Sequence, residues 1–307
     1  MGGPRAVPAL DAQALVEAVP ALAAVPDFRA ETLLGSPGPH LELGQALELA
    51  RRAARLAQEG AGVVITTGTD TLEEVAVLCA FIHDAEAPIV LTGASRPATS
   101  AGADGPANLV DAVSVAGAGA GAGLGVVVVF AAEIHAAMTV RKVDSTGPAT
   151  FGSPVAGPLG RVVEGRVWLH ARPVLPPRLA VDSIEHRVDI VYPGLGDDGA
   201  LLRLAAQNAD GVVLVAFGAG HLSVGLLREL RAAVPRIPVI VTCRPERSAM
   251  FCSTYGFEGS ESDVRSSGAV CAPFLSAQAA RIALLCGLGA GLDRDGLARA
   301  LRSWDVG

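Results

Sequence analysis

The stretch formed by residues 62–74 constrains the fold more than any other part of this sequence. It reads G-V-V-I-T-T-G-T-D-T-L-E-E, so a short apolar β-branched run is followed at once by four hydroxyls and a carboxylate. The apolar run is typical of a fully buried parallel strand, and the apolar spacing over residues 72–83 predicts a helix. A strand, a polar turn and a helix N-terminus together are typical of the ligand-binding edge of an open α/β sheet, where the helix end favours an anionic group.

The same alternation of apolar runs and helical patterns continues along the chain. Strands are predicted at 87–92, 126–130, 188–192, 211–216 and 238–242, a hairpin at 162–169, and helices at 104–116, 199–207, 224–233, 276–289 and 293–304. Strands alternating with helices predict a parallel, doubly wound sheet. The proline-containing segment 174–187 is the predicted linker between an N-terminal α/β domain, residues 1–173, and a C-terminal α/β domain, residues 188–307.

Charge and hydropathy exclude several classes of partner. The 307-residue chain has a net charge of −7, which argues against nucleic acid and against anionic membrane surfaces. Its longest apolar segment, near residues 126–132, is much shorter than the ~20 residues that a membrane span needs. The first residues, M-G-G-P-R-A-V-P, lack the hydrophobic region of a secretory signal. We therefore expect a cytoplasmic protein without nucleic-acid or membrane partners.

Two interpretations of Thr69 and Asp70 are open from the residues alone. Both residue types are common helix N-caps, and a turn between a strand and a helix needs a cap. The same side chains also supply a hydroxyl and a carboxylate at the expected ligand-binding edge. Lys142 lies in a polar stretch, residues 133–160, and taken alone is best interpreted as a solvated loop lysine.

Several separated motifs resemble one family, the bacterial-type asparaginases of the asparaginase/glutaminase family. T-T-G-T-D-T-L-E-E resembles the family signature T-H-G-T-D-T-M-E-E, with Thr67 in place of the histidine. Residues 93–100 and 103–109 resemble G-A-M-R-P-S-T-S and A-D-G-P-x-N-L, and residues 254–257 resemble part of the C-terminal domain. Lys142, within V-R-K-V-D-S-T, falls where the family has its catalytic lysine. The matches cover nearly the whole chain.

The resemblance implies a fold of two α/β domains, a larger N-terminal domain with a doubly wound, mostly parallel sheet and a smaller C-terminal one. It implies an amidohydrolase that converts L-asparagine to L-aspartate and ammonia through a threonine acyl-enzyme, without metal or organic cofactor. Preference between L-asparagine and L-glutamine stays open, since one methylene is worth only ~1–3 kcal/mol of discrimination. A homodimer or homotetramer is expected, because the family builds its site between subunits.

The resemblance also assigns roles to individual residues. Thr69, Asp70 and Lys142 would form the catalytic unit, with Lys142 as the base and Asp70 orienting it and binding the substrate ammonium. The hydroxyl of Ser36 and the helix-start N–H groups would hold the α-carboxylate, and the backbone of Ala94 would face the side-chain amide. The chemistry is consistent, because a threonine hydroxyl needs a neighbouring base and a lysine can serve as one.

Three features depart from the family pattern, and the first of them favours an alternative if the chain truly begins at Met1. Family members open with a strand ending in T-G-G-T-I, whose first threonine is the primary nucleophile, and we expect this segment to be missing from the chain. Residues 36–38 read S-P-G instead of S-Q-D, and His221 replaces an asparagine. Glu258 and Glu261 lie where a neighbouring subunit's acid would enter the site. The alternative is a non-catalytic homologue that binds a small amino acid or acts as an assembly subunit.

Overall fold

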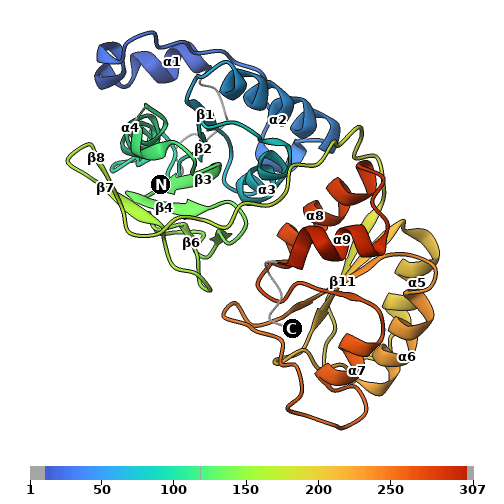
Figure 1. The fold of residues 1–307 in the computed structure, drawn as a ribbon. Helices are drawn as coiled ribbons and strands as arrows, with labels where there is room; N and C mark the ends of the chain where they lie inside the picture. The colour runs from blue at the N-terminus through green and yellow to red at the C-terminus, as the bar shows by residue number, and fades with distance from the viewer. Residues whose placement is uncertain (1–10, 118, 303–307) are drawn as a thin grey trace. The chain divides into compact units, whose positions relative to one another are not determined.

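The computed structural model describes residues 11–117 and 119–302 (Figure 1). The chain forms two compact units. Among the described residues, unit 1 contains residues 11–117, 119–153 and 157–173, and unit 2 contains residues 154–156 and 174–302.

Unit 1 is built on a six-stranded sheet with the strand order β1-β2-β3-β4-β7-β8. Strands β1, β2 and β3 are parallel, and the remaining neighbours are antiparallel. The elements of unit 1 are α1 (Ala12–Glu17), η1 (Pro20–Ala24), η2 (Gly38–His40), α2 (Leu43–Gln58), β1 (Val63–Thr66), α3 (Leu72–Ile82), β2 (Ile89–Thr92), α4 (Gly105–Gly117), η3 (Gly119–Gly121), β3 (Val126–Phe130), β4 (Glu133–Ala136), β5 (Arg141–Lys142), β6 (Phe151–Gly152), β7 (Gly160–Val163) and β8 (Arg166–Leu169).

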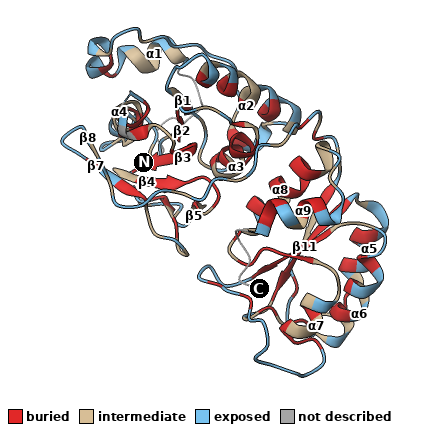
Figure 2. Cartoon of the chain, viewed as in Figure 1, coloured by how far each residue is buried: buried red, intermediate tan, exposed pale blue. Residues whose placement is uncertain are grey.

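The parallel strands of unit 1 are covered by helices on both faces. Helix α4 packs on β2 and β3 through Ala112 and Val115, in one core cluster with Val90 and Val127. Helix α3 also contacts both strands, from the other side of the sheet in Figure 1. Strands buried on both faces must be continuous apolar runs, and β2 and β3 are drawn as buried along their length in Figure 2. The predicted α/β class is confirmed, and the sheet of unit 1 is mixed.

The first parallel strand lies at one end of the strand order. Within the described residues β1 pairs with β2 alone, in a register that sets Thr66 beside Thr92. The expected loss of a preceding T-G-G-T-I strand stays a prediction, and residues 1–10 lie outside the described part of the chain.

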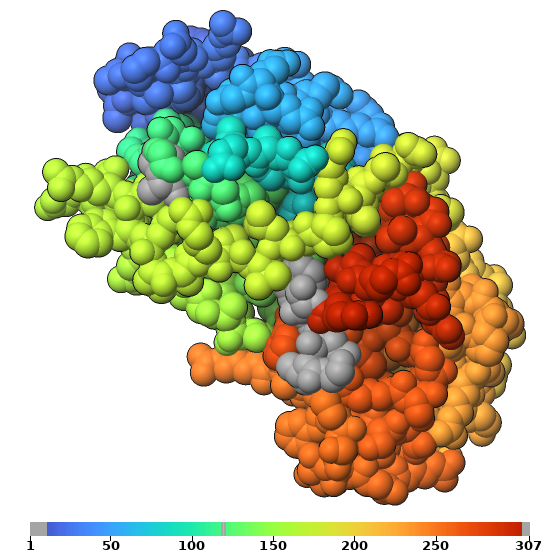
Figure 3. Space-filling model, viewed as in Figure 1, coloured from blue at the N-terminus to red at the C-terminus, as the bar shows by residue number. Residues whose placement is uncertain are grey.

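The opposite end of this sheet is a hairpin at the surface. Strands β7 and β8 pair around the turn Glu164-Gly165, as predicted, and form the yellow-green surface at the left of Figure 3. Trp168 on the outer strand is 63% exposed. In the part of the chain that the structure describes, no helix is both long and apolar enough to cross a membrane.

Unit 2 contains a four-stranded, fully parallel sheet with the order β12-β11-β10-β9. Helices α5 and α6 pack on each other, and α5 and α8 both contact β9 and β10. The elements are β9 (Val188–Val191), α5 (Ala200–Asn208), β10 (Gly211–Ala216), α6 (Val224–Ala233), β11 (Val239–Cys243), α7 (Glu261–Ser266), β12 (Val270–Cys271), α8 (Ala277–Gly289) and α9 (Arg294–Leu301).

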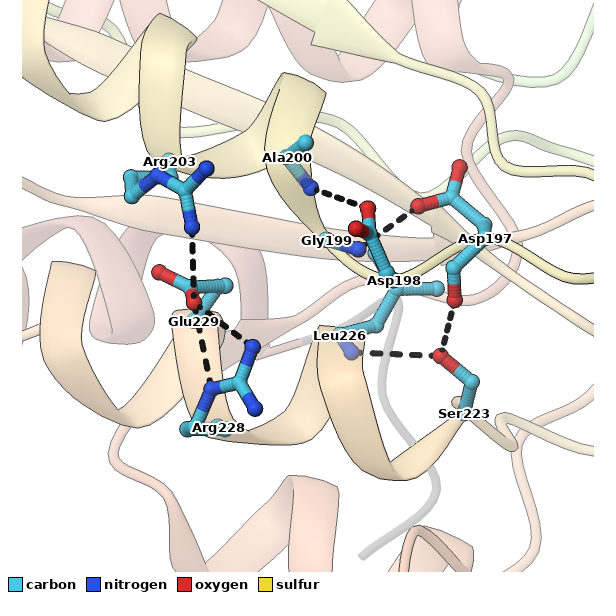
Figure 4. A network of polar contacts seen from close by, with 9 residues as sticks. All are labelled: Asp197, Asp198, Gly199, Ala200, Arg203, Ser223, Leu226, Arg228 and Glu229. Carbon is cyan, nitrogen blue, oxygen red and sulfur yellow. Dashed lines mark hydrogen bonds and ion pairs between the residues drawn. The ribbon is translucent and has the colours of Figure 1, made fainter.

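A polar network joins the N-terminal ends of α5 and α6 (Figure 4). The Ser223 hydroxyl donates to the carbonyl of Asp197 at 2.7 Å and accepts from the Leu226 amide at 3.1 Å, which caps α6. The carboxylate of Asp197 accepts from the amide of Gly199 at 2.8 Å. Every donor and acceptor named here is used within the unit, so we interpret the network as structural.

Candidate active site

The turn between β1 and α3 does not use its polar side chains as helix caps. Helix α3 begins at Leu72, and its N-cap is Thr71, whose side chain makes no capping hydrogen bond. Instead the Thr71 hydroxyl donates to the carbonyl of Gly38 at 3.3 Å. The interpretation of Thr69 and Asp70 as caps of this helix is therefore wrong, and both side chains are available for other contacts.

Those contacts are made with Lys142. Its Nζ lies 2.9 Å from the Thr69 hydroxyl oxygen and 2.7 Å from Oδ1 of Asp70. The Lys142 side chain is only 25% exposed, whereas that of Asp70 is 58% exposed. Lys142 is thus not a solvated loop lysine. The structure brings together the three residues that sequence motifs grouped, and their catalytic roles stay predictions.

A short ribbon of two strands carries Lys142 to this turn. Strands β5 and β6 are antiparallel, with Lys142 opposite Phe151. The Phe151 ring packs on that of Phe130 at the end of β3, with 5.1 Å between ring centroids. The backbone N–H of Lys142 donates to Oε2 of Glu73, in the first turn of α3. Sequence reasoning missed Glu73, although it belongs to the same motif as Thr69.

Burial and hydrogen bonding act in opposite directions on Glu73. Burial raises the pKa of this carboxyl, and the hydrogen bond from the Lys142 amide opposes the shift without cancelling it. The surroundings of Glu73 therefore favour the neutral form of its carboxyl more than water does.

Ala94 lies in a loop that is tied down on several sides. The Asp104 carboxylate accepts from the amides of Ser95 and Arg96 at 3.0 and 2.9 Å. Asn108 donates to the carbonyl of Gly93 at 3.0 Å, and its own oxygen accepts from the Ala131 amide at 3.0 Å. These contacts explain why A-D-G-P-x-N-L follows the loop motif in the sequence: Asp104, directly before α4, and Asn108, within α4, hold the loop.

The loop of Ala94 also approaches the central turn and the lysine ribbon. A Cβ on Gly93 would lie 2.5 Å from the carbonyl oxygen of Thr67, so only glycine fits this approach. The Ser95 hydroxyl donates to the carbonyl of Gly147 at 2.9 Å, in the segment between β5 and β6. Ala94 itself is exposed.

Ser36 lies on a second loop that adjoins the turn. It is exposed, two residues before Gly38, which packs against Gly68 so closely that a Cβ on Gly68 would lie 3.2 Å from the Gly38 nitrogen. Ser36 and Ala94 therefore belong to loops that touch the turn of Thr69 and Asp70. No group of three or more His, Cys, Asp or Glu side chains suited to a metal ion is found among residues 11–117 and 119–302.

Glu261 and His221 bind each other within unit 2. Glu261 is fully buried and accepts from the amides of Thr254 and Tyr255 at 2.7 and 2.8 Å and from Nε2 of His221 at 3.2 Å. Burial alone would raise the pKa of Glu261, but these hydrogen bonds outweigh it and lower that pKa. The expectation that Glu261 enters a neighbouring site does not fit a carboxylate held in its own loop, and the structural interpretation of His221 is favoured.

In unit 1 a hydroxyl, a carboxylate and an amine lie together at the carboxyl end of a parallel strand. These are groups that an amidohydrolase with a hydroxyl nucleophile needs. The sequence model of the family described as "Asparaginase, N-terminal" matches residues 2–175, and that of "Glutaminase/Asparaginase C-terminal domain" matches residues 187–301. The chain belongs to the asparaginase family.

Individual relatives agree with this assignment. The chain is 36% identical over 267 residues to a probable L-asparaginase of Deinococcus radiodurans, covering 86% of this chain and 82% of that protein. It is 30% identical over 285 residues to L-asparaginase 2 of Bacillus subtilis, covering 90% and 74% of the two chains. A solved structure of a probable cytoplasmic L-asparaginase from Campylobacter jejuni matches with a TM-score of 0.85 and 29% identity, over 95% and 94% of the two chains.

Proposed function

We propose that this protein hydrolyses L-asparagine to L-aspartate and ammonia through an ester on Thr69. The observation that carries the proposal is the contact of Lys142 with both Thr69 and Asp70. The similarity to L-asparaginases of several bacteria supports the choice of substrate class.

The proposed reaction begins with proton transfer from the Thr69 hydroxyl to the amine nitrogen of Lys142. The hydroxyl oxygen attacks the side-chain amide carbon of the substrate, and the resulting ammonium of Lys142 returns the proton to the departing nitrogen. The C–N bond breaks, ammonia leaves, and an aspartyl ester remains on Thr69. A water molecule, deprotonated by Lys142, then attacks the ester carbonyl, which releases L-aspartate and restores the hydroxyl.

The amino-acid composition gives independent support to Lys142 as a base. Lys142 is the only lysine among the 24 Lys and Arg residues of the sequence, so every other basic position of this type is arginine. Arginine stays protonated in proteins and cannot accept a proton from a hydroxyl, whereas a lysine amine can. The one position that keeps a lysine is the one where the proposed chemistry needs a deprotonable amine.

The remaining site residues are proposed to bind the substrate. Asp70, whose side chain is 58% exposed, would pair with the substrate ammonium through its free surface. Ser36 and the N–H groups at the start of α3 would hold the α-carboxylate, and the backbone of Ala94 would face the amide. L-Glutamine is the second substrate to test, since a similar protein of Pseudomonas fluorescens is named a glutaminase-asparaginase.

The decisive experiment compares ammonia release from L-asparagine by the wild-type protein and two variants. Lys142→Arg keeps a positive charge beside Asp70 but removes the base, and Thr69→Ala removes the hydroxyl, so each should lower kcat by about 10²-fold or more. Thr66→Ala, which removes an exposed hydroxyl three residues earlier, is the matched control and should stay active.

Two outcomes would contradict the proposal. Full activity of Lys142→Arg would show that the amine is not the base. Binding of L-asparagine by the folded wild-type protein without release of ammonia would instead establish the non-catalytic homologue. We also propose a cytoplasmic location, which the similarity to the Campylobacter jejuni protein supports and cell fractionation would test.

A further inference from the structure

One short segment of unit 1 holds both ends of Lys142. Thr69 and Asp70 contact its Nζ, and Glu73, three residues further along, accepts from its backbone N–H. The amine and the backbone N–H of Lys142 are therefore both bound by residues 69–73, which lead from β1 into α3. The distance from the amine to the Thr69 hydroxyl depends on both attachments.

The hydrogen bond to Glu73 is made by a Lys142 amide that points away from the ribbon of β5 and β6. On the next residue, the amide of Val143 donates back across the ribbon to the carbonyl of Thr150 at 2.8 Å. The amide of Lys142 points the other way and donates to Glu73. Since leaving a partly buried amide unpaired costs free energy, loss of the Glu73 carboxylate would release this edge of the ribbon.

Helix stability alone does not explain a carboxylate at position 73. Acidic residues in a first helical turn are favourable, and α3 has two of them, Glu73 and Glu74. Burial raises the pKa of Glu73, so its charge is disfavoured where it lies. An ionisable group whose pKa is shifted by burial, next to a lysine with a proposed role in catalysis, is typical of a functional site.

We propose that Glu73 is a positioning residue that sets the Lys142 amine against the Thr69 hydroxyl by holding the Lys142 backbone. This inference rests on the proposed function for its effect on catalysis. Its structural part, the placement of the amine, can be measured separately.

The kinetic test uses two substitutions at position 73 and one control. Glu73→Ala should lower kcat for L-asparagine roughly 10–100-fold with KM changed by less than about threefold, because misplacing a base by ~1 Å costs this much. Glu73→Gln keeps an acceptor oxygen at the same reach and should restore kcat to within about threefold of wild type. Glu74→Ala removes the same charge from the same helical turn and should leave kcat unchanged.

A labelling test reads the placement of the amine without activity. Because Lys142 is the only lysine, trinitrobenzenesulfonate labels one lysine side chain, and mass spectrometry separates that peptide from those that carry the N-terminal amine or a cysteine. We expect labelling of Lys142 to be several-fold faster in Glu73→Ala than in wild type, and close to wild type in Glu73→Gln and Glu74→Ala.

The two readouts separate failure of this inference from failure of the proposed function. Unchanged labelling and unchanged kcat in Glu73→Ala would overturn the positioning role. Equal loss of kcat in Glu73→Gln and Glu73→Ala would overturn it as well, since the acceptor would then not matter. A wild-type protein that releases no ammonia would refute the proposed function, and the labelling rates would still decide the role of Glu73. If Glu73→Ala does not fold, Glu73→Asp, whose oxygen falls short by one methylene, takes its place.

Discussion

Glu73 and Glu261 both accept backbone amides, and their pKa values move in opposite directions. Glu73 accepts one amide, and the effect of burial prevails, so its pKa is raised. Glu261 accepts two amides and a histidine N–H, and the hydrogen bonds prevail, so its pKa is lowered. The balance between burial and hydrogen bonding around each carboxylate sets the direction of its shift. It also decides how each residue affects stability as pH changes.

Glu261 predicts a loss of stability in acid. Since its pKa in the folded protein lies below the ordinary 4.5, its stabilising contribution is complete above that pH and is lost as the pH falls through the folded value. We expect the melting temperature of the wild-type protein to fall more steeply below pH ~4.5 than that of Glu261→Gln. If the melting temperatures of the two proteins fall by the same amount between pH 3 and pH 6, about the range where glutamate titrates, Glu261 does not cause the loss of stability.

At the scale of single elements, the turn between β3 and β4 carries backbone strain. Ala131 and Ala132 have φ angles of 49° and 62°, in the left-handed region that favours glycine. The contact between Asn108 and the Ala131 amide helps to hold this turn.

We expect Ala132→Gly to raise the free energy of unfolding by about 0.5–1 kcal/mol, because relief of the left-handed strain exceeds the added flexibility of the unfolded chain. Ala136→Gly, in the extended strand β4, is the matched control and should be destabilising. Urea unfolding of both variants measures the effect. A loss of stability in Ala132→Gly equal to that of the control would show that the turn is not strained.

Regular elements were predictable from the sequence where the apolar pattern is long and uninterrupted. The bounds of β3, β10 and α6 agree with the predicted ranges, and the hairpin of β7 and β8 lies around the predicted turn. The antiparallel strand β4 was not predicted, because its turn is Ala-Ala and alanine carries no turn signal. The ribbon of β5 and β6 has two residues in each strand, too few for any periodicity.

The candidate site was predictable only in part, because several of its contacts are made by backbone amides. Thr69, Asp70 and Lys142 carry reactive side chains within recognisable motifs. The role of Glu73 depends on a hydrogen bond from the backbone amide of Lys142, 69 residues away in the chain. Every residue except proline has such an amide, so the sequence does not indicate which amide a side chain binds. Likewise, the anchoring of the Ala94 loop by Asp104 depends on the amides of Ser95 and Arg96.

At the scale of the whole molecule, we propose that the protein assembles as a homodimer or homotetramer. Unit 2 exposes an aromatic cluster formed by Phe251, Tyr255 and Phe257, which are 43%, 44% and 49% exposed. Large exposed apolar groups gathered at one place are typical of an interaction surface.

Sedimentation equilibrium should therefore give a mass of two or four times 31.1 kDa. Phe257→Glu should weaken the assembly, because it places a charge in the buried interface. Leu201→Glu, on the exposed side of α5, is the control and should leave the mass unchanged. A wild-type monomer at micromolar concentration would refute the proposal.

The domain boundary stays a proposal at this scale, with residues 174–187 as the linker. Exposed apolar side chains at Val174 and Leu175 and the absence of helix or strand between β8 and β9 in the described chain support it.

The separation along the chain between Lys142 and its partners also sets the order in which these residues are synthesised. Thr69, Asp70 and Glu73 are neighbours and come together with the first turn of α3, but the amine lies 73 residues beyond Thr69. The chain between them forms β2, α4, β3 and β4, and closing so long a loop costs little more than closing a short one. A nascent chain therefore contains Thr69, Asp70 and Glu73 well before it contains Lys142. If Lys142 is the base, as we propose, the growing protein gains its activity only when the short ribbon of β5 and β6 packs on the turn.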